Sequence, residues 1–180
     1  MKTIIQSVRM LLMLTLLTGV AYPLAMTGLA QLAFPRQAQG SLVAANGKVV
    51  GSELLAQKFE NDAYFWPRPS AADYATVASG ASNKGPTSVD LAKQIEAQRA
   101  RFGPSASIDL LTSSASGLDP HISPEGARAQ IPRIAAARDV PADALSALVD
   151  QFVESPQLGF FGEPRVNVLN LNRALERLSL

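Results

Sequence analysis

An uncharged stretch from Met10 to Phe34 constrains this chain more than any other feature. As a helix it would extend roughly 37 Å, compared with about 30 Å for the hydrocarbon core of a bilayer. Pro23 lies within the stretch, and we expect the hydroxyls of Thr18 and Thr27, or a neighbouring helix, to satisfy the carbonyl that proline leaves free. The stretch therefore predicts one transmembrane helix at residues 10–34.

The charges on either side of this stretch predict its orientation. Lys2 and Arg9 precede it, and the next charged residue is Arg36. Because the flank richer in Lys and Arg stays in the cytoplasm, we expect residues 1–9 inside and the domain at 41–180 outside, after a connector at 35–40.

A cleaved secretory signal is the alternative interpretation. Gly28-Leu29-Ala30 resembles a cleavage site, and the N-terminus is basic. The apolar run continues past that site to Phe34, whereas the apolar core of a signal peptide usually spans about 7–15 residues. The pattern favours a retained anchor.

Composition excludes several classes of function. Of 16 basic residues, 14 follow the anchor, against 15 acidic ones, so the soluble domain is nearly neutral and does not suit nucleic acid. Cysteine is absent and His121 is the only histidine, which argues against thiol chemistry and transition-metal sites. From the residues alone, the domain is interpreted as a noncatalytic accessory or binding module.

Local patterns predict a mixed α/β soluble domain with a small sheet. Asn46-Gly47 suits a type I′ turn in a hairpin at residues 41–51. Ser123-Pro124-Glu125 is typical of a helix start, and Pro132 should interrupt that helix. The remaining expected elements are a helix at 88–102, a β-like run at 108–112, a helix from Pro141, a strand at 165–169 and a terminal helix at 170–180.

A long segment at 64–86 is rich in Pro, Gly, Ser and Asn. We expect it to lie at the surface and to satisfy its backbone locally. Its aromatic residues either dock on a partner or support the loop on its own domain, and the second interpretation is favoured. Within it, Arg68 lies between two prolines, which suits either a fixed contact with a carboxylate or aromatic ring or a solvated cation. The Gly/Ser turn at 80–86, with Lys84, is a weak candidate for anion binding.

The loop SGLDPHISP at 116–124 contains the residue types of a hydrolytic triad in Ser116, Asp119 and His121. A triad needs side chains that converge from separate elements, and neighbours in one loop broken by a proline are poorly placed for this. We therefore interpret the loop as a docking loop, shaped by Gly117 and by turn and cap hydrogen bonds from Asp119 and Ser123. An envelope hydrolase that uses His121 is the alternative.

Five strings carry a resemblance to a known family. They are YFWPRPSA (64–71), SGASNKGPT (79–87), LLTSSASGLDPHISP (110–124), QIPRIAAAR (130–138) and VNVLNLNRAL (166–175). In this order behind one N-terminal anchor, they resemble the small C subunit of the Kdp-type potassium-transporting P-type ATPase of bacteria and archaea. The resemblance covers nearly the whole chain. SGASN lacks a second glycine expected there, and AQKF lacks a glycine before its glutamine.

The resemblance implies a noncatalytic accessory subunit of an ATP-driven potassium uptake complex in the bacterial inner membrane. Its implied partners are a channel-like potassium-translocating subunit, a P-type ATP-hydrolysing subunit and a very small membrane peptide. It also implies a catalytic chaperone that raises the ATP affinity of the hydrolysing subunit, with ATP as a ligand. An outside domain conflicts with direct ATP contact, and we give the predicted orientation more weight. The candidate partner or nucleotide contacts are Arg68, Ser79, Gly80, Asn83, Gly117, Asp119, His121, Gln130 and Arg133.

Overall fold

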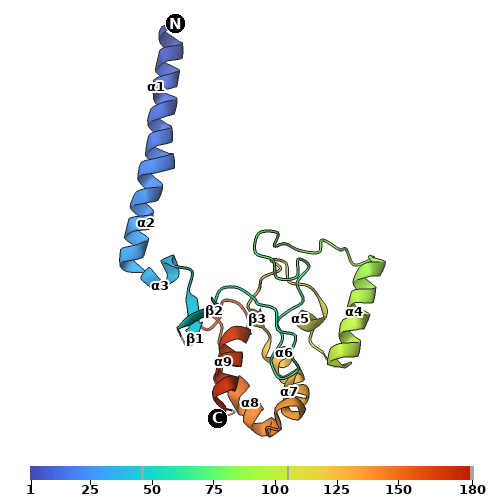
Figure 1. Cartoon of the computed structure of the whole chain (residues 1–180). Coiled ribbons are helices and arrows are strands. Elements are labelled where there is room, and N and C mark those ends of the chain that lie inside the picture. The colour runs from blue at the N-terminus through green and yellow to red at the C-terminus, as the bar shows by residue number, and fades with distance from the viewer. Residues whose placement is uncertain (46, 105, 179–180) are drawn as a thin grey trace. The chain divides into compact units, whose positions relative to one another are not determined.

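The computed structural model describes residues 1–45, 47–104 and 106–178 (Figure 1). The chain divides into two compact units, Met1–Leu42 and Val43–Leu180.

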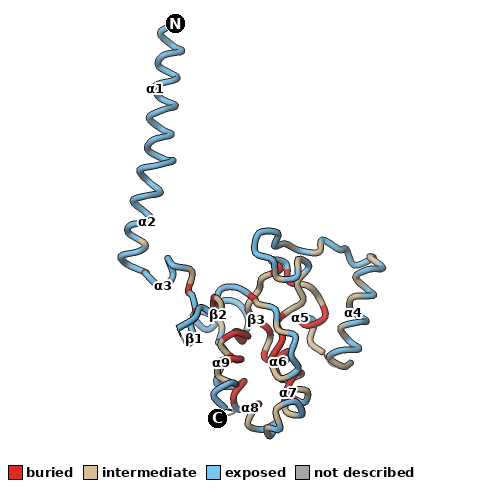
Figure 2. Tube along the Cα trace, in the orientation of Figure 1, coloured by how far each residue is buried: buried red, intermediate tan, exposed pale blue. Residues whose placement is uncertain are grey.

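The first unit is a helical run from Lys2 to Ala33, made of α1 (Lys2–Leu16), the π-helical turn η1 (Leu17–Ala21) and α2 (Tyr22–Ala33). In the part of the chain that the structure describes, this is the one helix long and apolar enough to cross a membrane. Its side chains are exposed along nearly the whole length (Figure 2). The helix ends where Phe34 (φ −138°) precedes Pro35, since the residue before a proline is disfavoured in helical backbone. A short helix α3 (Pro35–Ala38) follows.

Pro23 leaves a visible mark on this helix. A proline has no N–H, and its ring crowds the carbonyl four residues earlier, so the backbone widens into η1 just before it. Thr18 Oγ1 donates to the carbonyl of Leu14 (2.7 Å), and Thr27 Oγ1 donates to that of Pro23 (2.8 Å). The expectation that these hydroxyls satisfy the carbonyl freed by Pro23 is therefore wrong. Each one bonds the carbonyl four residues before itself, which already lies within reach of its side chain.

The second unit begins with the predicted hairpin. Strands β1 (Leu42–Ala45) and β2 (Lys48–Ser52) pair in a two-stranded sheet. Gly47 has φ +75°, in the left-handed region that a type I′ turn requires, while Asn46 lies outside the described residues.

Among the described residues, a three-stranded antiparallel sheet and six helices follow the hairpin. The strands are β3 (His121–Ile122), β4 (Val153–Glu154) and β5 (Arg165–Asn167), in the order β3-β5-β4. Ile122 and Val153 both lie opposite Val166 in the register. The helices are α4 (Val89–Phe102), α5 (Ile108–Leu111), α6 (Pro124–Ala129), α7 (Ile131–Arg138), α8 (Ala142–Gln151) and α9 (Val168–Leu178). This confirms the predicted mixed α/β domain with a small sheet.

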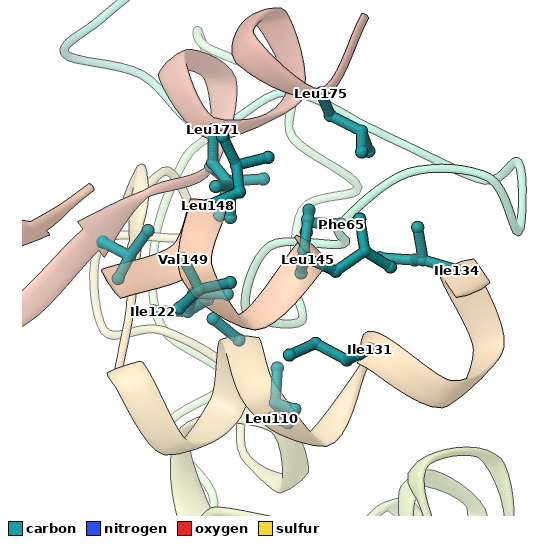
Figure 3. Close-up of a cluster of buried hydrophobic side chains, with 13 residues drawn as sticks. Phe65, Leu110, Ile122, Ile131, Ile134, Leu145, Leu148, Val149, Leu171 and Leu175 are labelled. Carbon is teal, nitrogen blue, oxygen red and sulfur yellow. The ribbon is translucent and has the colours of Figure 1, made fainter. Parts of the chain in front are cut away.

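The core lies between helices α6 to α9 and the three-stranded sheet (Figure 3). On α8, the side chains of Leu145, Leu148 and Val149 face inward at the spacing of one helical face. They meet Leu171 from α9 and Ile122 from β3. Burial of large aliphatic side chains is the main stabilising term in such a cluster.

Two predictions of secondary structure are wrong in this unit. Residues 108–111 form a helical turn rather than a β-like run, which places the neighbouring Leu110 and Leu111 in the interior. The strand predicted at 165–169 ends at Asn167, and α9 begins at Val168 instead of residue 170. The predicted helix starts at 88–89 and 123–124 are confirmed, as is the break before Pro132.

The 64–86 segment contains no helix or strand, but its first part enters the interior. Phe65 is fully buried and Trp66 is 6% exposed, so the aromatic residues support the loop on its own domain, as favoured. The backbone is not satisfied locally, contrary to expectation. The Asn172 amide accepts from Phe65 N (2.8 Å) and donates to Phe65 O (2.9 Å). The Gln130 amide likewise accepts from Trp66 N (2.8 Å) and donates to Trp66 O (3.0 Å).

Candidate functional site

The loop that leads into β3 is held in one shape by hydrogen bonds and by a glycine. Asp119 Oδ1 accepts from His121 N (3.0 Å), and Ser116 Oγ accepts from Leu118 N (3.1 Å). Gly117 has φ +71°, and a Cβ there would lie 2.9 Å from Gly80 O. Glycine is therefore required at 117, and the contact joins the loop to the segment at 79–83.

Arg68 reaches this loop from the stiff segment between its two prolines. Its Nη1 lies 3.3 Å from Asp119 Oδ2, and His121 Nδ1 lies 3.6 Å from Asp119 Oδ1. Tyr74 Oη donates to the Arg68 carbonyl (2.9 Å), which fixes the backbone that presents the cation. Of the two interpretations of Arg68, the structure selects the contact with a carboxylate.

Opposing influences act on the Asp119 carboxyl group. Burial raises its pKa, but the hydrogen bonds from His121 and the positive charge of Arg68 outweigh burial and hold the pKa below the ordinary value. Asp119 is therefore an anion near neutral pH. Its partners make it a structural and electrostatic element of the loop rather than a proton carrier.

The side chains of Arg68, Asp119 and His121 line a surface pocket of about 260 Å³, which we call the loop pocket. It is lined by Arg68, Asp109, Asp119, His121, Ile122, Ser123, Glu163, Pro164 and Arg165. Charges of both signs converge there, as at the polar rim of a protein interface. Among the described residues, no group of three or more His, Cys, Asp or Glu side chains is arranged to hold a metal ion.

Sequence reasoning found Arg68, Asp119 and His121, but it missed the side of the pocket made by Glu163, Pro164 and Arg165. The pairing of β3 with β5 brings these residues to the loop. The string FFGEP just before β5, with two aromatic residues followed by glycine and proline, was the available signal for an exposed turn.

The arrangement does not form a hydrolytic triad. Ser116 is exposed, and its Oγ accepts from the backbone of its own turn. His121 faces the carboxylate of Asp119, and no described contact joins it to Ser116. The structure does not support the hydrolase alternative, because the nucleophile and base must lie in hydrogen-bond reach of each other.

Gln130 and Arg133 form a separate cluster around Trp66. Gln130 is 1% exposed, and its amide is occupied by the Trp66 backbone and by Gly126 O (3.4 Å). The Arg133 guanidinium lies 3.7 Å from the centre of the Trp66 ring and donates to Gln130 Oε1 (2.9 Å). Burial lowers the pKa of Arg133 to about 10, partly offset by Asp62. Both side chains thus serve the fold.

The remaining candidates lie in the irregular segment at 79–83. Gly80 packs against Gly117, while Ser79 and Asn83 are exposed. Asn83 adopts a left-handed backbone (φ +52°), a conformation that asparagine tolerates better than most residues. Lys84 and Ser82 lie on a second hollow of about 520 Å³ beside α4. The nine candidates therefore lie in three places: the loop with its pocket, the Trp66 cluster, and the segment at 79–83.

The fold and the site define a mixed α/β domain that follows an apolar helix in the chain and carries a hydrogen-bonded loop beside a surface pocket. Comparison with known proteins places it more closely. The sequence profile of the family described as "K+-transporting ATPase, c chain" matches residues 4–177. A potassium-transporting ATPase KdpC subunit of Bradyrhizobium diazoefficiens is 48% identical over 98% of both chains. Those of Rhodopseudomonas palustris (98% of this chain, 97% of the relative) and Geobacter sulfurreducens (99% of both) are each 50% identical.

The chain therefore belongs to the family of the C chain of the potassium-transporting ATPase. Members of this family are accessory subunits of the transporter, not its catalytic subunit.

Proposed function

We propose that this chain is the accessory subunit of a high-affinity, ATP-driven potassium uptake complex in the bacterial inner membrane. Its relatives are named as KdpC subunits of a potassium-transporting ATPase, and the similarity extends over nearly the full length of both chains. This similarity is the observation that carries the proposal. The partners are a channel-like potassium-translocating subunit, a P-type ATP-hydrolysing subunit and a very small membrane peptide.

The N-terminal helix is retained as the anchor, and the soluble domain lies outside. The continuous helix from Lys2 to Ala33 and the basic residues Lys2 and Arg9 support this orientation. An outside domain has no access to cytoplasmic ATP. Any rise in ATP affinity that this subunit confers must then pass through the membrane subunits, without a nucleotide bound at Ser79, Asn83 or the Trp66 cluster.

The loop pocket with Arg68, Asp119 and His121 acts as a docking surface for the complex. Two observations support this role. Local hydrogen bonds and the Arg68–Asp119 ion pair fix the loop, and the pocket of mixed charge beside it is open at the surface. The 41–180 domain contributes shape and charge to assembly, and ATP hydrolysis stays in another subunit.

Co-expression with the other pump subunits tests this function. The tagged chain should co-purify with two large membrane proteins that hydrolyse ATP in response to potassium, and His121→Gln should keep both properties. Glutamine retains size and a hydrogen-bonding end but carries no titrating charge near neutrality. A hundredfold or larger fall in turnover by the intact His121→Gln complex is the scale of lost general acid–base catalysis, and it would contradict the docking role of the loop. Failure of the wild-type chain to co-purify would overturn the proposal.

A further inference from the structure

The connection between β4 and β5 exposes three large apolar side chains to solvent. Leu158 is 84% exposed, Phe160 69% and Phe161 58%. Together they present roughly 400 Å² of mostly apolar surface, given the size of aromatic side chains, and an apolar patch of that size on a soluble domain is often functional. No charged residue lies between Ser155 and Gly162. We call Leu158, Phe160 and Phe161 the apolar tip.

Backbone hydrogen bonds hold the apolar tip in shape. Gln157 and Phe161 exchange two bonds of 2.9 Å, and Gly159 N donates to Pro156 O (3.0 Å). Leu158 has φ +55°, a left-handed backbone conformation that is energetically unfavourable for a bulky side chain. Such a conformation persists only where the surrounding structure imposes it. The rings of Phe160 and Phe161 lie 4.1 Å apart between centroids. A tip fixed in this way loses little conformational freedom when it binds.

The apolar tip borders the loop pocket. A hollow of about 370 Å³ beside Phe161 also includes Glu163 and Arg165, and both of these residues line the loop pocket. The face therefore combines an apolar projection with a neighbouring charged rim. This is the anatomy of protein interfaces in which a few aromatic anchors carry most of the affinity.

Charge decides what kind of partner suits this face. Arg165 Nε pairs with Glu154 Oε2 (3.0 Å), which leaves the carboxylate of Glu163 as the next charge beside the tip. The surface of an anionic bilayer attracts basic segments and disfavours such an acidic flank. A second copy of the same face would bring two Glu163 carboxylates together. A protein pocket that is apolar inside and basic at its edge complements both features.

We propose that the apolar tip inserts into an apolar, basic-edged pocket on a membrane subunit of the pump and anchors this domain to it. The inference rests on the proposed function, because it requires a pump partner. It assigns the contact to particular side chains, which family membership does not do.

Co-purification of the full chain with the pump subunits tests the apolar tip. The double variant Phe160→Ser/Phe161→Ser should recover with the complex at least tenfold less, while its thermal unfolding stays unchanged because both rings lie outside the core. The matched control is Val77→Ser/Val89→Ser, which removes two other exposed side chains (101% and 67%) and should co-purify normally. Normal recovery of the Phe160/Phe161 variant would overturn this inference but would leave the proposed function intact. Absence of the wild-type chain from the complex would overturn the proposed function as well.

Photocrosslinking identifies the occupant directly. The variant Phe160→p-benzoylphenylalanine keeps an aromatic side chain at the tip, so it should assemble. Irradiation of membranes that contain the whole complex should join it to a large membrane subunit. Crosslinks to lipid alone, or only to a second copy of this chain, would contradict the proposed partner.

Discussion

Two buried amide side chains fix the conformation of the segment that carries Phe65 and Trp66. Asn172 bonds the N–H and the carbonyl of Phe65, and Gln130 bonds the N–H and the carbonyl of Trp66. Each side-chain amide thus takes the place of a neighbouring β-strand's backbone. A buried backbone group without a partner loses its hydration and gains nothing in return. These amides therefore hold in place the segment from which Arg68 reaches the loop pocket.

Asn172→Leu tests the first of these amides. Leucine is similar in size but leaves both backbone groups of Phe65 unpaired. At about 1–3 kcal/mol for each orphaned group, we expect a loss of about 2–6 kcal/mol in the free energy of unfolding, measured by urea titration of the detergent-solubilised chain. Asn170→Leu, at a half-exposed position of the same helix, is the control and should cost less than about 1 kcal/mol. Equal losses in the two variants would show that Asn172 has no special role.

The carboxylate of Asp119 should make the domain sensitive to acid. Its pKa is lowered in the folded state, because the hydrogen bonds from His121 and the charge of Arg68 outweigh burial. A carboxyl group with a depressed folded pKa contributes stability that is fully present above its unfolded value, near 3.8, and is lost as pH falls through the folded value. Asp119→Asn keeps an oxygen acceptor for His121 N but cannot ionise.

We therefore expect the unfolding free energy of Asp119→Asn to fall less than that of the wild type between pH 6 and pH 3. The comparison is made by urea titration at each pH. Asp143→Asn, which removes an exposed carboxylate of α8, serves as the control. Parallel curves for Asp119→Asn and the wild type would contradict the assignment.

The residues of the site differ in how far the sequence could reveal them. Asp119, His121 and Ser123 lie within five positions, so their turn and cap roles follow from local chemistry. The amides of Gln130 and Asn172 bond to segments 64 and 107 positions away in the chain. No local pattern distinguishes such an amide from one that points into solvent, because its role depends on tertiary contacts.

At the scale of elements, helix starts were the most predictable feature. Ser123 Oγ accepts from Gly126 N at 2.9 Å, as the sequence predicts for this cap. Ser88 Oγ accepts from Leu91 N at 3.4 Å, at the predicted start of α4. Residues 108–111 were harder, since a short apolar run fits a strand as well as a buried helical turn. In the structure, the Asp109 carboxylate accepts from Ser123 N (2.7 Å), and this bond ties α5 to the start of α6.

The two caps should differ in their effect on stability. Ser123→Ala removes a short bond at a helix with buried residues and also the contact of its Oγ with Asp109 (3.0 Å), so we expect a loss of about 1–2 kcal/mol. Ser88→Ala removes a longer bond from α4, which has no fully buried residue, and should cost about 0.5 kcal/mol or less. Urea titration of both variants measures the difference. A larger loss in Ser88→Ala would reverse this ranking of the two helices.

For the whole molecule, the main question is on which side of the membrane the domain lies. The helix of the first unit is flanked by Lys2 and Arg9 at its start and by Arg36 after its end. The N-terminal side of the helix carries two basic side chains and the amino terminus, whereas the other side carries one basic side chain. The difference is small, but these charges lie close to the helix ends, where they influence orientation most strongly. We therefore expect the N-terminus in the cytoplasm.

The absence of cysteine makes the orientation directly measurable, because a single introduced thiol is the only one in the chain. Val77 is fully exposed on the soluble domain, so Val77→Cys should react with a membrane-impermeant maleimide in intact spheroplasts. Gln6→Cys, in the first turns of α1, should react only after lysis. The pattern of labelling, read by the mass shift of the purified chain, gives the side of each position.

The reverse pattern would change the mechanism as well as the topology. A domain in the cytoplasm would have access to ATP, and the exposed Ser79 and Asn83 would again be candidates for nucleotide contact. A cytoplasmic domain would also place the apolar tip and the loop pocket on the cytoplasmic side of the membrane, where ATP is hydrolysed. Labelling of Val77→Cys in intact cells instead leaves the outer surface of the membrane subunits as the partner. Any influence on ATP hydrolysis must then cross the bilayer through those subunits, because allosteric coupling requires a physical element that both sites bias.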